Sequence, residues 1–320
     1  MKPIFFFITL TISCFMASAQ QMPKLRCGDT VAIVSPARGL SEKQLQPALD
    51  MLAAQGYYVL IGEHVMDDEG IFAGTDAQRA ADFQAALDNP SVKAIICARG
   101  GYGSVRFIDM LNFDRFRQYP KWICGFSDVT VFHSHLQVLG YPTLHSVMPI
   151  TMRAEEKDVP YIESMFSALR GDTLRYGFAA DARNRVGEAE GVVVGGNLSI
   201  LYSLLCSGSD IDTEGKILFI EDTDEYLYHI DRMMRALKRA GKLSGLRGLI
   251  VGGMNKIHDN KTPFGQDVPE IILTVCADYD FPICFDFPAG HCGQNYALPL
   301  GTAAKLRVGE SGCELEFMGK

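Results

Sequence analysis

The sequence predicts an open α/β fold with a parallel sheet in its first half, followed by a smaller C-terminal α/β domain. Short apolar runs such as "TVAIVSPA" and "VKAIICARG" alternate along the chain with amphipathic stretches such as "DAQRAADFQAALDN". The apolar runs have no polar face, which is typical of parallel strands covered by helices on both sides. A polar stretch then separates two series of this kind, as expected for a boundary between domains.

In the first half, each strand is expected to lead into a helix. Ser41 and Gly56 supply a helix start and a helix stop. The expected strands are 30–37, 57–65, 92–100, 121–127 and 141–149, and the expected helices are 41–56, 76–89, about 104–111 and 128–140.

The second half repeats the pattern less regularly. We expect a signal peptide at 1–19, a first domain at 20–170, a linker region at 171–190 and a second domain at 191–320. Apolar or amphipathic segments at 191–205, 216–222, 228–243 and 245–253 form the second domain, and the last segment, 303–318, reads as a hairpin.

Composition excludes several classes of protein. The 320 residues are 48% hydrophobic and 21% charged, as in ordinary globular proteins. A net charge of −8 argues against a nucleic-acid partner, which selects a basic face. Eight cysteines follow residue 19, several of them inside apolar runs, so we expect most of them to be buried. No C-x-x-C is present, and neither a metal nor another cofactor is predicted.

The first residues have the pattern of an export signal. "MKPIFFFITLTISCFMASAQ" combines a lysine, an apolar stretch and Ala-Ser-Ala, which predicts cleavage before Gln20. The stretch is short for a membrane span, so we expect no stable membrane insertion after cleavage. Cys14 lacks the leucine usual three residues before a lipidated cysteine, which disfavours a lipoprotein anchor. The expected location is the periplasm.

Ser127, in "KWICGFSDVTVFHSHL", stands where a buried strand turns into a helix. Such a serine is most often an N-cap. It can also be a nucleophile raised on a sharp strand-to-helix turn, although the match to G-x-S-x-G is partial because the second glycine is missing. The N–H of Asp128 at the helix start could then stabilise negative charge on a substrate oxygen.

Other candidates follow strand ends, where sites form in open sheets. "ARGGYGSVRF" matches no phosphate-binding loop and is either a plain turn or a source of oxyanion donors. Glu221 ends the run "KILFIED", and His291 lies in the loop "FPAGHCGQNYALPLG". His133 and His135 face opposite sides of a helix and form no metal pair, and His145 has at most a supporting role.

Seven segments in order resemble the LD-carboxypeptidases, a family that includes the microcin C immunity peptidases. They run from about Thr30 to the C-terminus: "ARGGYGSVRFID", "GFSDVTVFHSHL", "LHSVMP", "GGNLS", "KILFIED", "IDRMMRALKRAG" and "FPAGHCGQNYALPLG". The resemblance implies a flavodoxin-like N-terminal domain, a C-terminal domain, a site in the cleft between them, and a homodimer.

The resemblance also implies a serine peptidase with Ser127 as nucleophile, His291 as general base and Glu221 orienting the imidazole. The N–H groups of Gly101 and Asp128 would form the oxyanion hole. The implied reaction releases D-alanine from murein tetrapeptides through an acyl-enzyme.

The residues that would bind the substrate, and its identity, are less well defined by the sequence. Arg38 and Arg106, near strand ends, are the cations we expect for its terminal carboxylate. The sequence has "HSVMP" where the family commonly has His-Gly-Pro, which could reshape the pocket wall. The alternatives are a serine hydrolase of another amide, such as an acylated amino-acyl nucleotide, and a periplasmic peptide-binding protein without catalysis.

Overall fold

The first sheet carries six strands in the order β11-β5-β4-β3-β1-β2. The computed structural model describes residues 22–153, 155 and 159–318, so the predicted signal peptide lies outside the described residues. All pairs are parallel except β11 with β5. The bounds are β1 Thr30–Val34, β2 Tyr58–Ile61, β3 Val92–Cys97, β4 Trp122–Gly125, β5 Thr143–His145 and β11 Leu298–Leu300.

Helices cover this sheet, as the alternation of patterns predicts. They are α1 Glu42–Ala54, α2 Asp76–Asp88, α3 Asp114–Gln118, α4 Thr130–Val138 and α5 Val159–Arg170. The helix expected at 104–111 is wrong: two 3-10 turns, Ser104–Arg106 and Ile108–Met110, occupy that stretch. Gly103 precedes them at φ 155°, a backbone conformation that cannot begin an α-helix.

The second sheet has seven strands in the order β10-β9-β8-β7-β12-β13-β6. β7 to β10 are parallel to one another, and the remaining pairs are antiparallel. The bounds are β6 Arg175–Phe178, β7 Gly187–Asn197, β8 Ile217–Thr223, β9 Gly248–Asn255, β10 Ile283–Cys284, β12 Ala303–Val308 and β13 Cys313–Phe317; the helices are α6 Leu198–Ser203, α7 Leu227–Arg239 and α8 Val268–Val275.

Two of the expectations from the sequence concern strands of the second sheet. The hairpin expected at 303–318 is confirmed by the antiparallel β12–β13 pair. The stretch 171–190, expected as a linker, instead contains β6 and the start of β7, both of them strands of the second sheet. Polar residues alternate with buried ones in these strands because one face of this part of the sheet is open to solvent.

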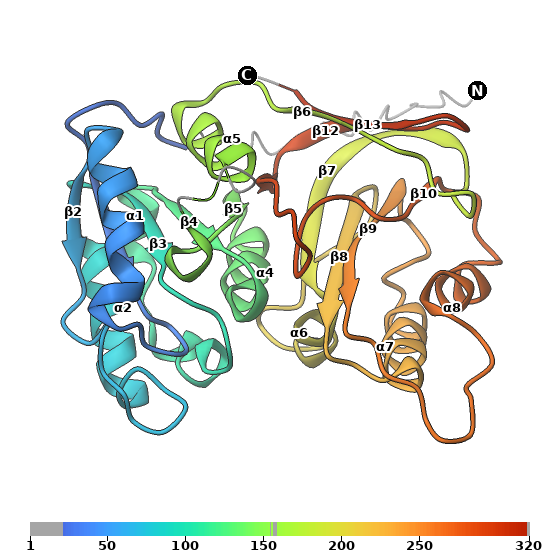
Figure 1. Cartoon of the computed structure of the whole chain (residues 1–320), viewed down its shortest axis with the longest axis horizontal. Coiled ribbons are helices and arrows are strands. Elements are labelled where there is room, and N and C mark those ends of the chain that lie inside the picture. Colours follow the sequence, from blue (N-terminus) through green and yellow to red (C-terminus); the bar gives the residue numbers. More distant parts are fainter. Residues whose placement is uncertain (1–21, 154, 156–158, 319–320) are drawn as a thin grey trace, which may run out of the picture.

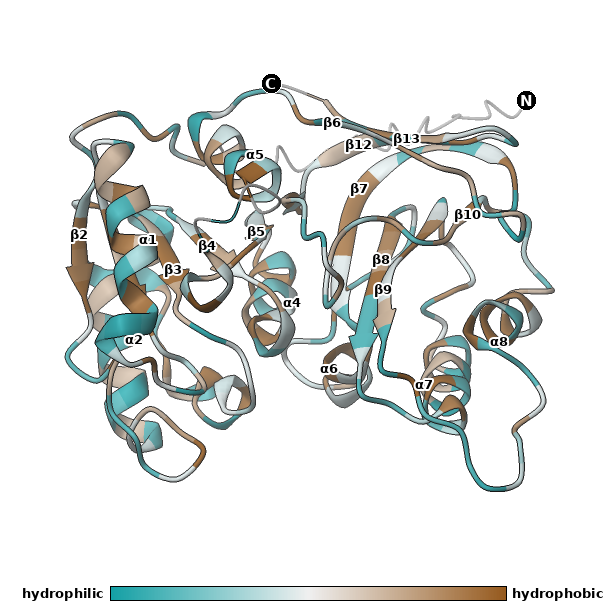
Figure 2. Cartoon of the chain, viewed as in Figure 1, coloured by the Kyte–Doolittle hydropathy of each residue, from teal (hydrophilic) through white to brown (hydrophobic). Residues whose placement is uncertain are grey.

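The central strands of both sheets are mostly apolar, apart from residues such as Lys93 in β3 and Glu221 in β8, and Figure 2 shows much of β3, β8 and β9 in brown. In β3, five of the six residues are buried. Five of the eight described cysteines are buried, which confirms their expected place in the core: Cys97, Cys124, Cys276, Cys284 and Cys313. No described cysteine forms a disulfide.

The two lobes lie side by side, with α4 between their sheets (Figure 1). The backbone N–H of Asn197, at the end of β7, donates to Thr130 Oγ1 over 2.9 Å. Further along α4, Ser134 Oγ donates to the Ser209 carbonyl. The chain also crosses back, because β11 comes from the second half of the sequence and pairs with β5. Within the described ranges, no helix is both long and apolar enough to cross a bilayer.

Candidate active site

Ser127 follows β4 on a sharp turn, with a backbone φ of 65°. A non-glycine residue in this left-handed region costs about 1–3 kcal/mol, and such strain concentrates at functional sites. The N-cap residues of the 3-10 turn at 127–129 and of α4, which begins at Thr130, are Phe126 and Val129, and Ser127 Oγ forms no hydrogen bond with a described residue. Ser127 is therefore not the N-cap that the commoner interpretation of the sequence would make it.

The loop after β3 packs against this serine. A Cβ placed on Gly100 would lie 3.0 Å from Ser127 Cβ and 3.2 Å from its Oγ, so the two backbones approach closely. Gly101 has a φ of 130°, and a Cβ there would lie 2.8 Å from Cγ of Arg38. The loop is thus shaped for residues without a side chain, and Gly100 lies directly against the serine.

Asp128 ties the same loop to the turn. Its buried carboxylate accepts a hydrogen bond from the backbone N–H of Ser104 over 2.8 Å. Burial raises the pKa of Asp128, while hydrogen bonds from Ser104 and Gly103 act in the opposite direction. The Asp128 carboxylate therefore holds the glycine loop in place. The backbone N–H of Asp128 takes no part in this contact.

His291 and Glu221 form a hydrogen-bonded pair at the edge of the second sheet. Glu221, in β8, is fully buried, and its Oε2 accepts from His291 Nδ1 at 2.6 Å and from the His291 backbone N–H at 3.1 Å. The His291 side chain is 22% exposed. With Nδ1 as donor, Nε2 is left as the acceptor nitrogen of the neutral ring.

Charge sets the basicity of His291. Burial acts to lower its pKa, but the hydrogen bond to Glu221 and the charges of Glu221 and Asp222 outweigh burial, so the pKa lies above its ordinary 6.5. Burial and the charge of Glu221 raise the pKa of Asp222 to about 7. Asp222 accepts from Asn197 Nδ2 and from the backbone N–H of Ser199, which fixes the neighbouring strand end.

The interface between the lobes brings the turn that carries Ser127 close to the His291–Glu221 pair. Thr130, three residues after Ser127, binds the N–H of Asn197, which pairs with Glu221 in the sheet register. The ring of Phe126 meets the ring of His291 edge-on, with centroids 5.0 Å apart. Ser127 and His291 share no hydrogen bond in this arrangement, and catalytic hydrogen bonds commonly tighten only in the substrate complex.

The other predicted residues lie in different surroundings. Arg38 is exposed and lies against Gly101, next to the serine loop. Arg106 instead binds Asp76, with Nε–Oδ1 at 2.8 Å, and stacks over Phe72. His133 Nε2 donates to the Gly125 carbonyl over 2.9 Å, and burial lowers the pKa of His133 to about 4.

His145 lies beneath the site. Its ring contacts Phe126 and Phe219, and neither ring nitrogen has a hydrogen-bond partner. Burial, followed by the nearby His133 and His291, holds the pKa of His145 well below 6.5. Three residues on, the side chain of Met148 reaches the Gly100 loop, with Cε 3.5 Å from where a Gly100 Cβ would stand.

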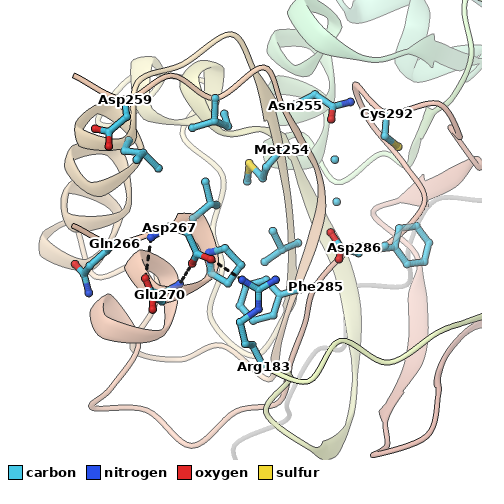
Figure 3. Close-up of a pocket in the computed structure, with 18 of the residues that line it drawn as sticks. Arg183, Met254, Asn255, Asp259, Gln266, Asp267, Glu270, Phe285, Asp286 and Cys292 are labelled. Carbon is cyan, nitrogen blue, oxygen red and sulfur yellow. Dashed lines mark hydrogen bonds and ion pairs between the residues drawn. The ribbon is translucent and has the colours of Figure 1, made fainter. Parts of the chain in front are cut away.

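A cavity of about 900 Å³ shares a wall with the His291 loop. Figure 3 shows Asn255 and Cys292 at one end of it, and Arg183 paired with Asp267 at the other. The Asn255 amide donates to the His291 carbonyl and so holds the loop from behind. Asn255 was not among the residues predicted from the sequence, because a polar residue at the end of an apolar run gives no indication of its distant partner. Among the described residues, no cluster of three or more His, Cys, Asp or Glu could hold a metal ion.

Comparison with known proteins identifies both halves. Residues 31–146 match the LD-carboxypeptidase N-terminal domain, and residues 190–306 match the LD-carboxypeptidase C-terminal domain. The chain is 34% identical over 304 residues to the "Probable murein peptide carboxypeptidase" of Bacillus subtilis, covering 93% of this chain and 95% of that protein. It is 27% identical to the "Murein tetrapeptide carboxypeptidase" of Pseudomonas aeruginosa over 86% of this chain and 92% of that protein.

Solved structures agree on the architecture. The muramoyltetrapeptide carboxypeptidase from Oxalobacter formigenes superposes with a TM-score of 0.83 at 26% identity, over 91% of this chain and 99% of that chain. The microcin C7 self immunity protein MccF in complex with aspartyl sulfamoyl adenosine gives 0.83 at 20% identity, over 93% and 98% of the two chains. The second likeness is one of fold. Together these matches confirm the expected two-part α/β architecture and the resemblance read from the motifs.

Proposed function

The chain belongs to the LD-carboxypeptidase family and is a carboxypeptidase, and we propose that it works as a serine enzyme that releases D-alanine from murein tetrapeptides. The observation that carries the proposal is the strained turn of Ser127, whose preceding residue, Phe126, packs its ring against His291 of the His291–Glu221 pair. The names of the relatives supply the substrate class.

In the proposed acylation step, Ser127 Oγ attacks the scissile carbonyl while His291 Nε2 takes the hydroxyl proton. The N–H groups of Gly101 and Asp128 stabilise the oxyanion, and a preorganised donor of this kind is worth roughly 10²–10³ in rate. His291 then gives the proton to the leaving nitrogen, D-alanine departs, and Ser127 is left as an ester. Glu221 keeps the imidazole in the tautomer that this transfer needs.

Deacylation runs the same path with water. His291 takes a proton from the water molecule, hydroxide adds to the ester carbonyl, and the proton returns to Ser127 Oγ as the ester bond breaks. A raised His291 pKa suits both steps, because the ring must accept a proton and give it back near neutral pH.

The proposal also includes a cellular location and an oligomeric state. The export pattern at 1–19 supports a periplasmic enzyme that works beside the wall. A homodimer is proposed on the family resemblance. The D-alanine carboxylate needs a cation near Ser127, and Arg38 lies against the loop that contacts that serine.

The test is to incubate the mature chain and its Ser127→Ala variant with a murein tetrapeptide and to follow D-alanine by mass spectrometry. Ser244→Ala, at an exposed serine, is the matched control. Release by the parent and the control but not by Ser127→Ala supports the proposal. Equal release by all three identifies a wrong nucleophile, and release by none points to another amide, such as an acylated amino-acyl nucleotide, or to a binding protein.

A further inference from the structure

A second cavity, of about 430 Å³, lies on the first lobe and has arginines on its wall. Arg38 and Arg99 both line it, although only Arg38 is singled out by the sequence. The rest of the wall comes from the segment after β1 and from a loop after β2, which supplies Asp67 and Asp68.

The strand order places this cavity beside the nucleophile. β4, β3 and β1 are consecutive neighbours in the sheet and run parallel. Ser127 follows β4, Arg99 follows β3, and Arg38 follows β1. The three residues therefore occupy successive positions along one edge of the sheet, the edge at which open parallel sheets bind their ligands.

Direct contacts join the cavity to the serine. Arg99 precedes Gly100, whose backbone packs against Ser127, and the Arg38 side chain lies against Gly101. Nε of Arg38 is 3.1 Å from where a Gly101 Cβ would stand. A group held by these arginines would thus lie within one residue of an amide proposed to stabilise the oxyanion.

The charge of both arginines is available. Neither forms an ion pair with any described residue, whereas Arg106 is bound to Asp76. Two carboxylates share the cavity wall: Asp67, which is bound to His64 Nδ1 at 2.8 Å, and Asp68. Asp67 is therefore already engaged by His64, whose pKa this hydrogen bond raises.

We propose that Arg38 and Arg99 bind the terminal carboxylate of the peptide. The inference rests on the proposed function and replaces Arg106 with Arg99 as the second cation. Two guanidinium groups beside the leaving amine accept a free carboxylate and discriminate against a blocked or extended chain end, because charge-assisted bonds are lost.

The test compares two substrates that differ in one charge. The same tetrapeptide is supplied with a free C-terminus and as its C-terminal amide, and D-alanine and D-alaninamide are measured by mass spectrometry. For the parent, kcat/KM should favour the acid by roughly ten- to a hundredfold, the range typical of hydrogen bonds to a charged group. Arg99→Gln and Arg38→Gln should each reduce this ratio, mostly through KM, and the double variant should bring it close to one.

The ratio is taken within each variant, so a loss common to both substrates cancels, and urea unfolding checks that each variant is folded. Arg117→Gln, at an exposed arginine of α3, removes the same charge elsewhere and should keep the ratio. An unchanged ratio in Arg99→Gln, equal losses on both substrates, or a collapse confined to Arg106→Gln would overturn the assignment while leaving the proposed function intact. No release by the parent would overturn the proposed function itself, and this inference with it.

Discussion

The two halves of the candidate site are built by different means. On the first lobe, backbone conformation does most of the positioning: Ser127 is strained, and Gly101 takes a φ open mainly to glycine. On the second lobe, side chains do it: Glu221 receives two hydrogen bonds from His291, and Asn255 holds the loop from behind.

The difference follows from what each half must do. A nucleophile and its oxyanion donors must meet one carbon atom from fixed directions, and backbone groups move little. A general base must change its protonation state during each turnover, so its surroundings must tune a pKa as well as a position. We therefore expect changes in the first lobe to alter rate and stability, and changes in the second to alter pH dependence as well.

The largest effect should come from Glu221→Gln. The amide keeps the shape but removes the charge that raises the pKa of His291 and fixes its tautomer. We expect kcat to fall by about 10⁴, as in comparable triads. The parent needs neutral His291, so its activity should rise with pH through a pKa above 6.5; the remaining activity of the variant should rise at lower pH. A pH–rate profile checks both, and a shift to higher pH would contradict the comparison.

Gly101→Ala should have the next largest effect. The new Cβ would meet Arg38 at 2.8 Å, at a φ that alanine rarely adopts, so the loop must move. If its N–H is an oxyanion donor, kcat should fall by roughly 10²–10³ with the acid limb of the pH profile unchanged. Steady-state kinetics across pH would show this. A shift of the acid limb of the pH–rate profile would mean that the first lobe also influences the pKa of the general base, against the comparison drawn above.

Asp128→Ala should act mainly on stability. It leaves the Ser104 N–H without its buried acceptor, which costs about 1–3 kcal/mol in the free energy of unfolding. We also expect a lower kcat, because the glycine loop loses its tie to the serine turn. Urea unfolding measures the first effect, and Asp109→Ala, at an exposed position nearby, is the control. A stable variant with an unchanged rate would show that the loop holds its shape alone.

His145→Phe should give the smallest change at neutral pH, because the ring it replaces has no hydrogen-bond partner. The parent should lose stability as pH falls below 6.5, since the unfolded chain binds protons that buried His133 and His145 do not take up. Each such histidine contributes at most about 1.4 kcal/mol per pH unit. The variant should lose less between pH 6.5 and 5. Equal losses in urea unfolding would mean that His145 is charged when folded.

Local patterns predicted the first sheet well, because its parallel strands are short, mostly apolar runs that stand out from the flanking segments. They failed where the signal is mixed. α5 and α8 went unpredicted, although Asp267 and Glu270 form a capping box at the start of α8. β6 was assigned to a linker because its alternation is that of a strand with one wet face.

The site divides in the same way. Ser127 and the glycine loop stand at recognisable strand ends, whereas Glu221 and His291 are 70 residues apart and only motif resemblance joined them before the structure did. Arg99 was missed because an arginine after a buried strand looks the same whether it faces solvent or a cavity. Its role depends on the neighbouring strand, and strand order is not a local property of sequence.

One strand makes the order of synthesis matter. β11, at Leu298–Leu300, closes the edge of β5 and comes from near the end of the chain. Until residue 300 has been made, Thr143, Leu144 and His145 form an uncovered edge, although all three are buried in the finished protein. A stalled or truncated chain would carry its first lobe with this edge strand unpaired, and unpaired edges are surfaces on which chains aggregate. The first sheet can therefore be completed only after nearly the whole chain has been synthesised. Until then, a nascent chain would benefit from a chaperone that covers the edge of β5.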